Sequence, residues 1–301
     1  MKLNAAGIRT IAENWLGERC LGIRYEASKT AILSGWKVNP RALLIICILY
    51  GGLISSPKTF ADRSSTSPGV ISRAVQLQDQ VDSQSRQIAP NGTPWFRVYR
   101  GCIPVIVTAP HATRPFRQGQ YRFSDGGGTA ALANALHETA GVTAIFTVYE
   151  SPSDPNFYDD NDFKLTVRRI IDNEHPRLLL DIHASAPERP YDVDLGTMNG
   201  LSLMGQLSIR DDLVAVLRRN GVRTISIDFF SAARNGTITK FASSLGVPAV
   251  QLEINSAWLV PGRSELSTRR FGVLVRALTA YLRSTFPLPQ MAGRDEEYAC
   301  R

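Results

Sequence analysis

The sequence has few cysteines and histidines, and it lacks the motifs of several common enzyme classes. Its 301 residues include four cysteines and no Cys-x-x-Cys pair, which excludes a thiolate zinc cluster and a thioredoxin-like site. It has no Gly-x-Ser-x-Gly elbow, no Walker loop and no His-Glu-x-x-His helix. The glycine triplet at 126–128 lacks the spacing of a dinucleotide-binding loop. Any catalytic site must therefore be assembled from residues scattered along the chain.

The larger part of the chain also lacks an excess of either charge. Net charge is +7, but residues 1–61 hold eight basic against three acidic residues, and the rest holds 26 basic against 24 acidic. Since most of the positive charge lies in the N-terminal segment, the composition argues against a nucleic-acid partner. The content of 44% hydrophobic and 20% charged residues is typical of a globular protein.

No apolar run reaches the roughly 20 residues of a membrane span. The longest, Ala42–Ile54, follows basic residues and precedes small ones, the pattern of a secretory signal peptide with cleavage after Ala61. We therefore expect residues 1–61 to be a leader and the protein to be exported to the periplasm, with translation beginning near Val38 as one explanation of the long upstream segment. The alternative is an uncleaved inner-membrane anchor at residues 42–54, which would then be the only membrane contact.

The remaining chain is expected to form a linker, one domain and a tail. Residues 62–94 are rich in Ser, Gln, Asp and Arg and predict a flexible linker, with a short helix around Ser72–Ser85. Residues 95–290 show no repeat and predict a single domain, followed by a polar tail at 291–301. Of the cysteines that remain after cleavage, Cys102 and Cys300 could pair in an oxidising compartment, but free thiols are expected.

From residue 96 onward, short apolar runs alternate with helical patterns. The predicted strands are 104–109, 144–148, 177–182, 191–195, 222–228 and 249–254. The predicted helices are 129–139, 162–173, 206–220, 237–245 and 265–285. This alternation predicts an α/β fold in three αβα layers, with a mostly parallel twisted sheet flanked by helices on both faces.

Three polar residues stand at or near the carboxyl ends of predicted strands. His111 and His183 follow the two clearest buried strands, and Glu253 interrupts the apolar strand at 249–254. Ligands of open α/β sheets bind outside the carboxyl ends of the strands, so all three side chains are expected at one edge. A carboxylate inside a strand is costly to bury unless a positive group pairs with it. A metal ion would meet that need.

Catalytic zinc typically takes three protein ligands and keeps a fourth position for water. His111 and His183 supply nitrogens, and Asp125, fourteen residues after His111, is the candidate oxygen ligand. Glu253 would act as general base toward zinc-bound water. Asp181 lies two residues before His183, projects to the same side of the strand and is expected to orient it.

Each of these candidate site residues could also be present for a structural reason unrelated to metal binding. Asp125 could cap the following helix, Glu253 could pair with an arginine such as Arg263 or Arg269, and a histidine at a strand end is usually an ordinary polar residue. The arrival of polar groups from three separate strands at one edge favours the joint interpretation.

In their order along the chain these motifs resemble those of the N-formylglutamate amidohydrolase family. The matching stretches, within roughly residues 100–260, are Ala109-Pro110-His111-Ala112, Asp125, Leu180-Asp181-Ile182-His183 and Leu252-Glu253-Ile254-Asn255. The resemblance implies a phosphorylase/hydrolase-like fold and Zn²⁺ held by His111, Asp125 and His183, with Glu253 as the catalytic carboxylate. It also implies hydrolysis of the amide bond of an N-acylated amino acid or a similar small, peptide-like substrate.

The family's Asp-Leu-Asn-Arg stretch, which holds the substrate carboxylate, is represented here only by residues 159–164 (DDNDFK). Asn161, Lys164 and the nearby Arg168 are therefore the candidate substrate-binding residues. Lys164 or Arg168 would replace the family's arginine as a point charge, without its bidentate fork.

Two alternatives remain open. The N-acetylmuramoyl-L-alanine amidases, which act on the cell wall, resemble this chain in the order and spacing of His, acid, His and Glu, and export favours that substrate. Against them, their acidic ligand is usually Glu, and residues 192–200 look more like the formylglutamate group. The alternative of another class is a metal-free binding protein on the same fold.

Overall fold

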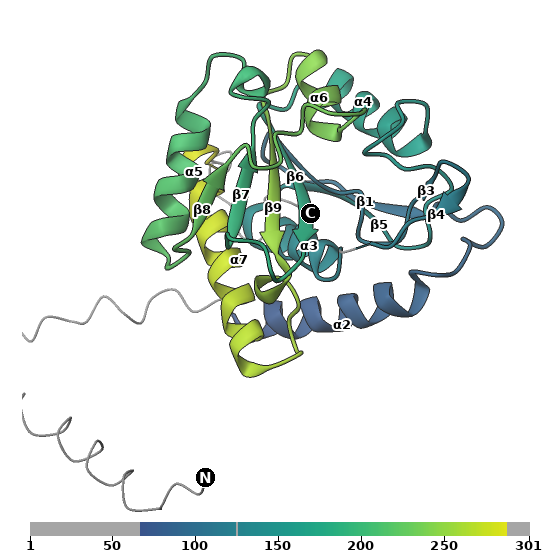
Figure 1. Cartoon of the computed structure of the whole chain (residues 1–301), viewed down its shortest axis with the longest axis horizontal. Helices are drawn as coiled ribbons and strands as arrows, with labels where there is room; N and C mark the ends of the chain where they lie inside the picture. The colour runs from purple at the N-terminus through teal and green to yellow at the C-terminus, as the bar shows by residue number, and fades with distance from the viewer. Residues whose placement is uncertain (1–66, 125, 288–301) are drawn as a thin grey trace, which may run out of the picture. The chain divides into compact units, whose positions relative to one another are not determined.

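The computed structural model describes residues 67–124 and 126–287 (Figure 1). Its main sheet has seven strands in the order β1-β5-β2-β6-β9-β7-β8. The strands are β1 (Phe96–Tyr99), β2 (Val105–Ala109), β5 (Thr143–Thr147), β6 (Leu178–Ser185), β7 (Val193–Gly196), β8 (Ile225–Ile227) and β9 (Ala249–Asn255). The β1–β5 and β7–β9 pairs are antiparallel and the other neighbours are parallel. The predicted mostly parallel sheet is confirmed.

Helices cover both faces of this sheet, which confirms the three layers (Figure 1). One face packs against α2 (Pro68–Gln84), α3 (Thr129–Ala140), α5 (Ser208–Arg219) and α7 (Glu265–Thr285). The other packs against α4 (Asp162–Glu174) and α6 (Ile238–Ser244). The chain also forms the 3₁₀ turns η2 (Leu201–Leu203) and η3 (Ser256–Trp258) and a separate hairpin of β3 (Phe116–Arg117) and β4 (Gln120–Tyr121).

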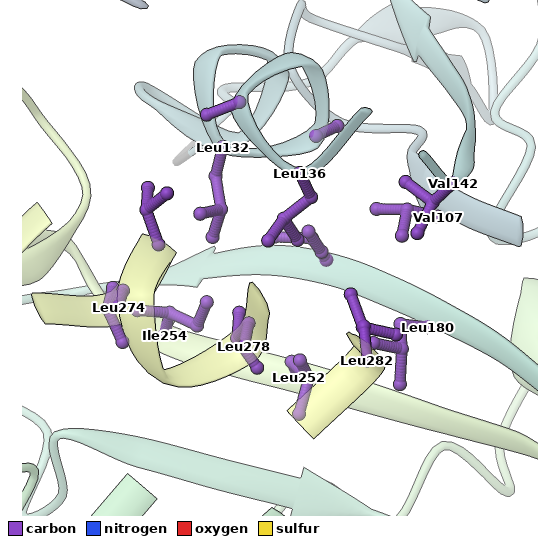
Figure 2. Packing of buried hydrophobic residues seen from close by; sticks show 14 of the residues in the cluster. Val107, Leu132, Leu136, Val142, Leu180, Leu252, Ile254, Leu274, Leu278 and Leu282 are labelled. Atoms are coloured by element: carbon purple, nitrogen blue, oxygen red, sulfur yellow. The ribbon is translucent and has the colours of Figure 1, made fainter. Parts of the chain in front are cut away.

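The larger core lies between the central strands and the α3 and α7 side. Strand residues alternate between the two faces, so Val107, Leu180 and Leu252 point to this side, where they meet leucines of both helices (Figure 2). The helix residues in this layer are Leu132 and Leu136 of α3 and Leu274, Leu278 and Leu282 of α7. Burying one such side chain contributes about 1.5–3 kcal/mol, which makes this layer a main source of stability.

Helix α2 corrects the prediction of a flexible linker at 62–94. It is longer than the short helix expected there, and its buried face packs against α3. Gln78 on that face is 3% exposed, and its side-chain oxygen accepts a hydrogen bond from the Gly128 backbone N at 2.8 Å. The face also contains Ala74 beside two valines. Because an alanine and a glutamine occupy buried positions of this face, its apolar periodicity is weak. The packed face therefore cannot be recognised from the sequence alone.

The leader with its apolar segment at 42–54 and the polar tail at 291–301 lie outside the described residues. Within residues 67–124 and 126–287, no helix has both the length and the hydropathy needed to cross a bilayer. Cys102 is disulfide-bonded, contrary to the expected free thiol. Proximity of two cysteines depends on the folded chain, so sequence spacing alone does not determine it.

Candidate functional site

A group of polar side chains occupies the α4 and α6 side of the sheet near the carboxyl ends of its central strands. On β6, Asp181 and His183 alternate with apolar residues of the opposite core, so both face this side. The parallel register pairs Asp181 with Gln251 of β9 and His183 with Glu253. His183 and Glu253 are therefore lateral neighbours on adjacent strands, which lie about 4.8 Å apart in a sheet.

A cavity of about 330 Å³ opens beside this group, and His111, His183 and Glu253 all line it. The structure thus brings together three of the four residues that sequence analysis assigned to metal binding and catalysis. His111 follows the end of β2, as predicted, whereas His183 lies inside β6, which continues to Ser185.

Each cavity histidine donates a hydrogen bond from Nε2 to a buried carboxylate. The distance from His111 Nε2 to Asp154 Oδ1 is 2.7 Å, and that from His183 Nε2 to Asp181 Oδ2 is 3.0 Å. Asp181 is held in turn by Thr108, whose Oγ1 donates to Asp181 Oδ1 at 2.7 Å. The centroids of the two imidazole rings are 5.0 Å apart. In the part of the chain that the structure describes, neither Nδ1 makes a hydrogen bond, so each ring retains one nitrogen for another ligand.

Negative charge surrounds the His183 ring. Burial opposes protonation of His183, but the charge and hydrogen bond of Asp181, with the charges of Glu253 and Asp154, raise its pKa to about 9. Burial also favours the neutral form of Asp154, yet His111, the Asn156 backbone N–H and Arg117 outweigh it and lower the pKa of Asp154. Asp154 is therefore ionised at neutral pH, and the field of these carboxylates favours a bound cation.

The two histidines fit a divalent metal site, but a third ligand is not found among the described residues. Histidines that bind metal usually donate their other ring N–H to a carboxylate, which fixes the orientation of the ring, and His111 and His183 both do so. Among the described residues, no three His, Cys, Asp or Glu side chains are arranged to hold a metal ion. Asp125, the predicted third ligand, lies outside the described residues.

The described residues on both sides of Asp125 lie against His111. Ser124 Oγ donates a hydrogen bond to the backbone carbonyl of His111. A Cβ atom at position 126 would stand 1.7 Å from that carbonyl oxygen, so only glycine fits there. The first glycine of the triplet thus permits a close approach of this segment to the His111 backbone.

Glu253 is positioned by polar neighbours on the same sheet face. Gln251 Nε2 donates to Glu253 Oε1 at 2.9 Å. On the other side, Asp194 of β7 pairs with Glu253 in the antiparallel register. The buried Asp194 carboxylate accepts hydrogen bonds from the backbone N–H groups of Phe229 and Phe230 at 3.1 and 2.8 Å. These bonds hold the loop that carries Phe230 in the cavity wall.

The three predicted substrate-binding residues do not line this cavity. Asn161 caps α4, with its Oδ1 accepting a hydrogen bond from the Lys164 backbone N at 3.0 Å. The Lys164 side chain is fully buried, and its Nζ donates to Asp159 Oδ1 at 2.6 Å and to the Gly236 carbonyl. The Arg168 guanidinium lies over the Phe241 ring, 5.3 Å from its centroid. All three have structural partners in and around α4.

The cavity wall also contains residues that the sequence patterns do not single out, notably Asp154 and the arginines Arg117, Arg122 and Arg189. Asp154 follows β5, so the same strand-end rule that selected the histidines could have identified it. Arg117 lies in the β3–β4 hairpin, whose two-residue strands leave no detectable pattern in the sequence.

No protein-family model and no curated protein matches this chain. The solved structures that are similar to it include the following three. A metallo-carboxypeptidase from Burkholderia cenocepacia has a TM-score of 0.42 and 13% identity over 71% of this chain and 69% of its own. A succinylglutamate desuccinylase from Chromobacterium violaceum has a TM-score of 0.42 and 14% identity over 72% and 80%. N-formylglutamate amidohydrolase from Ralstonia eutropha JMP134 has a TM-score of 0.41 and 16% identity over 63% and 98%, and its name is that of the family that the sequence motifs resemble.

Proposed function

We propose that this protein is a metal-dependent hydrolase that cleaves an amide bond in an N-acylated amino acid or a similar small, peptide-like substrate. The observation that carries the proposal is the convergence of His111, His183 and Glu253 on one cavity from three separate segments of the chain. Two imidazoles whose Nε2 atoms bond to carboxylates, and whose Nδ1 atoms make no hydrogen bond to a described residue, are the donors expected of a metal site. Metal binding would displace the proton that the raised pKa of His183 keeps on its ring at neutral pH.

In this proposal His111 and His183, together with Asp125, hold Zn²⁺. Bound zinc supplies a Lewis acid that polarises the substrate carbonyl and lowers the pKa of water. Asp154 and Asp181 fix the two imidazole rings through their Nε2 atoms, so Nδ1 would be the nitrogen that each ring offers to the ion. The negative field of the site offsets the charge of the cation.

Glu253 is the proposed general base. Its carboxylate takes a proton from the attacking water as the C–O bond forms, and it returns that proton to the leaving nitrogen as the C–N bond breaks. The products are a carboxylic acid and an amine. Glu253 is suited to this role because Gln251 orients one carboxylate oxygen and the side chain lines the cavity.

Metal content and substrate preference test the proposal together. Purified protein should contain one zinc per chain by elemental analysis, and His111→Ala and His183→Ala should each lower that content. Amine release from a panel of N-acyl amino acids, set against release from muropeptides, separates the amidohydrolase from a cell-wall amidase. Wild-type protein that binds no divalent metal would support the metal-free binding protein instead.

We further propose that the protein acts in the periplasm after removal of the leader, on a small molecule and not on nucleic acid. The sequence carries this part of the proposal, through the signal-peptide pattern and the balanced charge beyond residue 61. Sequencing of the mature N-terminus tests it: Asp62 should be the first residue, whereas an intact N-terminus in the membrane fraction indicates an anchor.

A further inference from the structure

A second cavity, of about 560 Å³, adjoins the first at Glu253. The two cavities share four wall residues, Arg117, Asn156, Phe230 and Glu253. The first cavity contains the two histidines and the second does not. A substrate whose scissile bond lies beside Glu253 therefore has room for a further group on the side away from the histidines.

Gln251 gives the second cavity a buried hydrogen-bond acceptor. Its side chain is buried, and its Nε2 already donates to Glu253. Its Oε1 is buried and has no hydrogen-bond partner in the described chain. Buried polar atoms of folded proteins almost always have a hydrogen-bond partner. We therefore expect Gln251 Oε1 to accept a hydrogen bond from an N–H or O–H group of a molecule bound in the cavity that Gln251 lines.

Two arginines supply positive charge to the same cavity. Arg234 lines it, and its side chain makes no hydrogen bond or ion pair within the described residues. Arg117 stands at the junction of the two cavities, with Nη1 3.4 Å from Asp154 Oδ2. Its Nε is buried and has no hydrogen-bond partner among the described residues. Asp228, which also lines this cavity, is already engaged, since its carboxylate accepts hydrogen bonds from the Thr197 backbone N at 2.6 Å and from Thr197 Oγ1 at 2.8 Å.

We propose that the second cavity binds an amino-acid unit of the substrate in which an amide N–H lies next to a carboxylate. Gln251 Oε1 accepts the N–H, and Arg234 binds the carboxylate. The substrate is accordingly of the peptide-like kind named in the proposed function, an acidic molecule that extends across both cavities. The position of the scissile bond beside Glu253 rests on the proposed function, whereas the binding site itself rests on the cavity.

Binding of two probes to metal-stripped protein tests this inference without any turnover. Isothermal titration calorimetry of the EDTA-treated protein should show N-acetyl-glutamyl-glutamate binding at least about 10-fold more tightly than its C-terminal α-amide, since the amide lacks the carboxylate that Arg234 binds and one charge-assisted contact has about this effect. Arg234→Ala should remove most of that preference, and Arg234→Lys should retain part of it. Arg219→Ala, an equal charge change on an exposed residue of α5, should leave it unchanged.

Equal affinity for the two probes would overturn the inference, as would an Arg234→Ala variant that behaves like Arg219→Ala. Circular dichroism and the melting temperature establish that each variant is folded. If the zinc-loaded protein hydrolyses neither probe but still prefers the free acid over the amide in an Arg234-dependent way, the proposed function fails and the binding site stands.

Discussion

His183 and Glu253 occupy paired positions on β6 and β9, two adjacent parallel strands in the middle of the sheet. Their side chains project from the same face, and both line the 330 Å³ cavity. Groups on central strands are held more precisely than groups on loops, because the hydrogen-bonded ladder fixes the backbone on both sides. The relative position of the imidazole and the proposed general base is thus set by the sheet itself.

Glu253→Gln should abolish amide hydrolysis and leave the zinc content unchanged. The amide has nearly the same shape but cannot accept the proton of the attacking water, so kcat should fall by about 10²–10⁴-fold. Steady-state kinetics and elemental analysis measure the two effects. Glu265→Gln, on the exposed first turn of α7, is the control and should retain full activity. A fully active Glu253→Gln enzyme would exclude Glu253 as the base.

Asp154→Asn should weaken zinc binding by about 10–100-fold, the usual cost of removing a carboxylate that supports a metal-bound histidine. Asp154 accepts the 2.7 Å hydrogen bond from His111 Nε2, so the variant loses the charge that orients this ring. Competition with a chromophoric chelator gives the affinity. Asp211→Asn, at an exposed ion pair with Arg210, should bind zinc like the wild type. An unchanged affinity in Asp154→Asn would show that the carboxylate does not support a metal ligand.

Gly126→Ala should lower both stability and zinc content, whereas Gly127→Ala should be tolerated. A Cβ at position 126 would meet the His111 carbonyl at 1.7 Å, but one at position 127 would lie 3.8 Å from Val260. Forcing an extra methyl group into a packed site costs about 1–3 kcal/mol or more, and here the displaced group is the backbone of a proposed ligand. Urea unfolding and elemental analysis compare the neighbouring variants; similar behaviour of both would contradict the close approach.

Lys164→Met should destabilise the protein without raising KM. Its ammonium group is buried and donates to Asp159 and to the Gly236 carbonyl. It does not line the cavity, so it is not available for the substrate binding that the sequence suggests. Loss of a donor to a partly buried carbonyl costs about 1–3 kcal/mol, which urea unfolding can detect. A large rise in KM at unchanged stability would instead restore Lys164 as a substrate ligand.

The sequence predicted the helices and central strands well because their local signals are strong. The range 265–285 matches α7 at both ends, and Ser264 and Ser267 form a capping box at its N-terminus. Gly141, with φ of 76°, ends α3 close to the predicted position. The polar residues His183 and Glu253 were recognisable because they interrupt otherwise apolar runs.

What the sequence did not predict depends on contacts between distant segments. The strand order is set by packing of the whole chain, and β1 has no distinctive pattern. Asp154 bonds to His111, which lies 43 residues away in the sequence. Arg117 lines the cavity from a hairpin whose strands are too short to be recognised in the sequence. For the same reason, Lys164 and Arg168 looked available in the sequence although both lie against partners around α4 and α6.

Near the carboxyl ends of the central strands, the two faces of the sheet carry different kinds of side chain. The leucines beneath α3 and α7 form an apolar layer without chemistry (Figure 2). Asp181, His183 and Glu253 stand on the opposite face. Exchanging a side chain on the reactive surface leaves that layer intact. A scaffold divided in this way can acquire a new specificity through a few local replacements while its resistance to denaturation stays nearly constant.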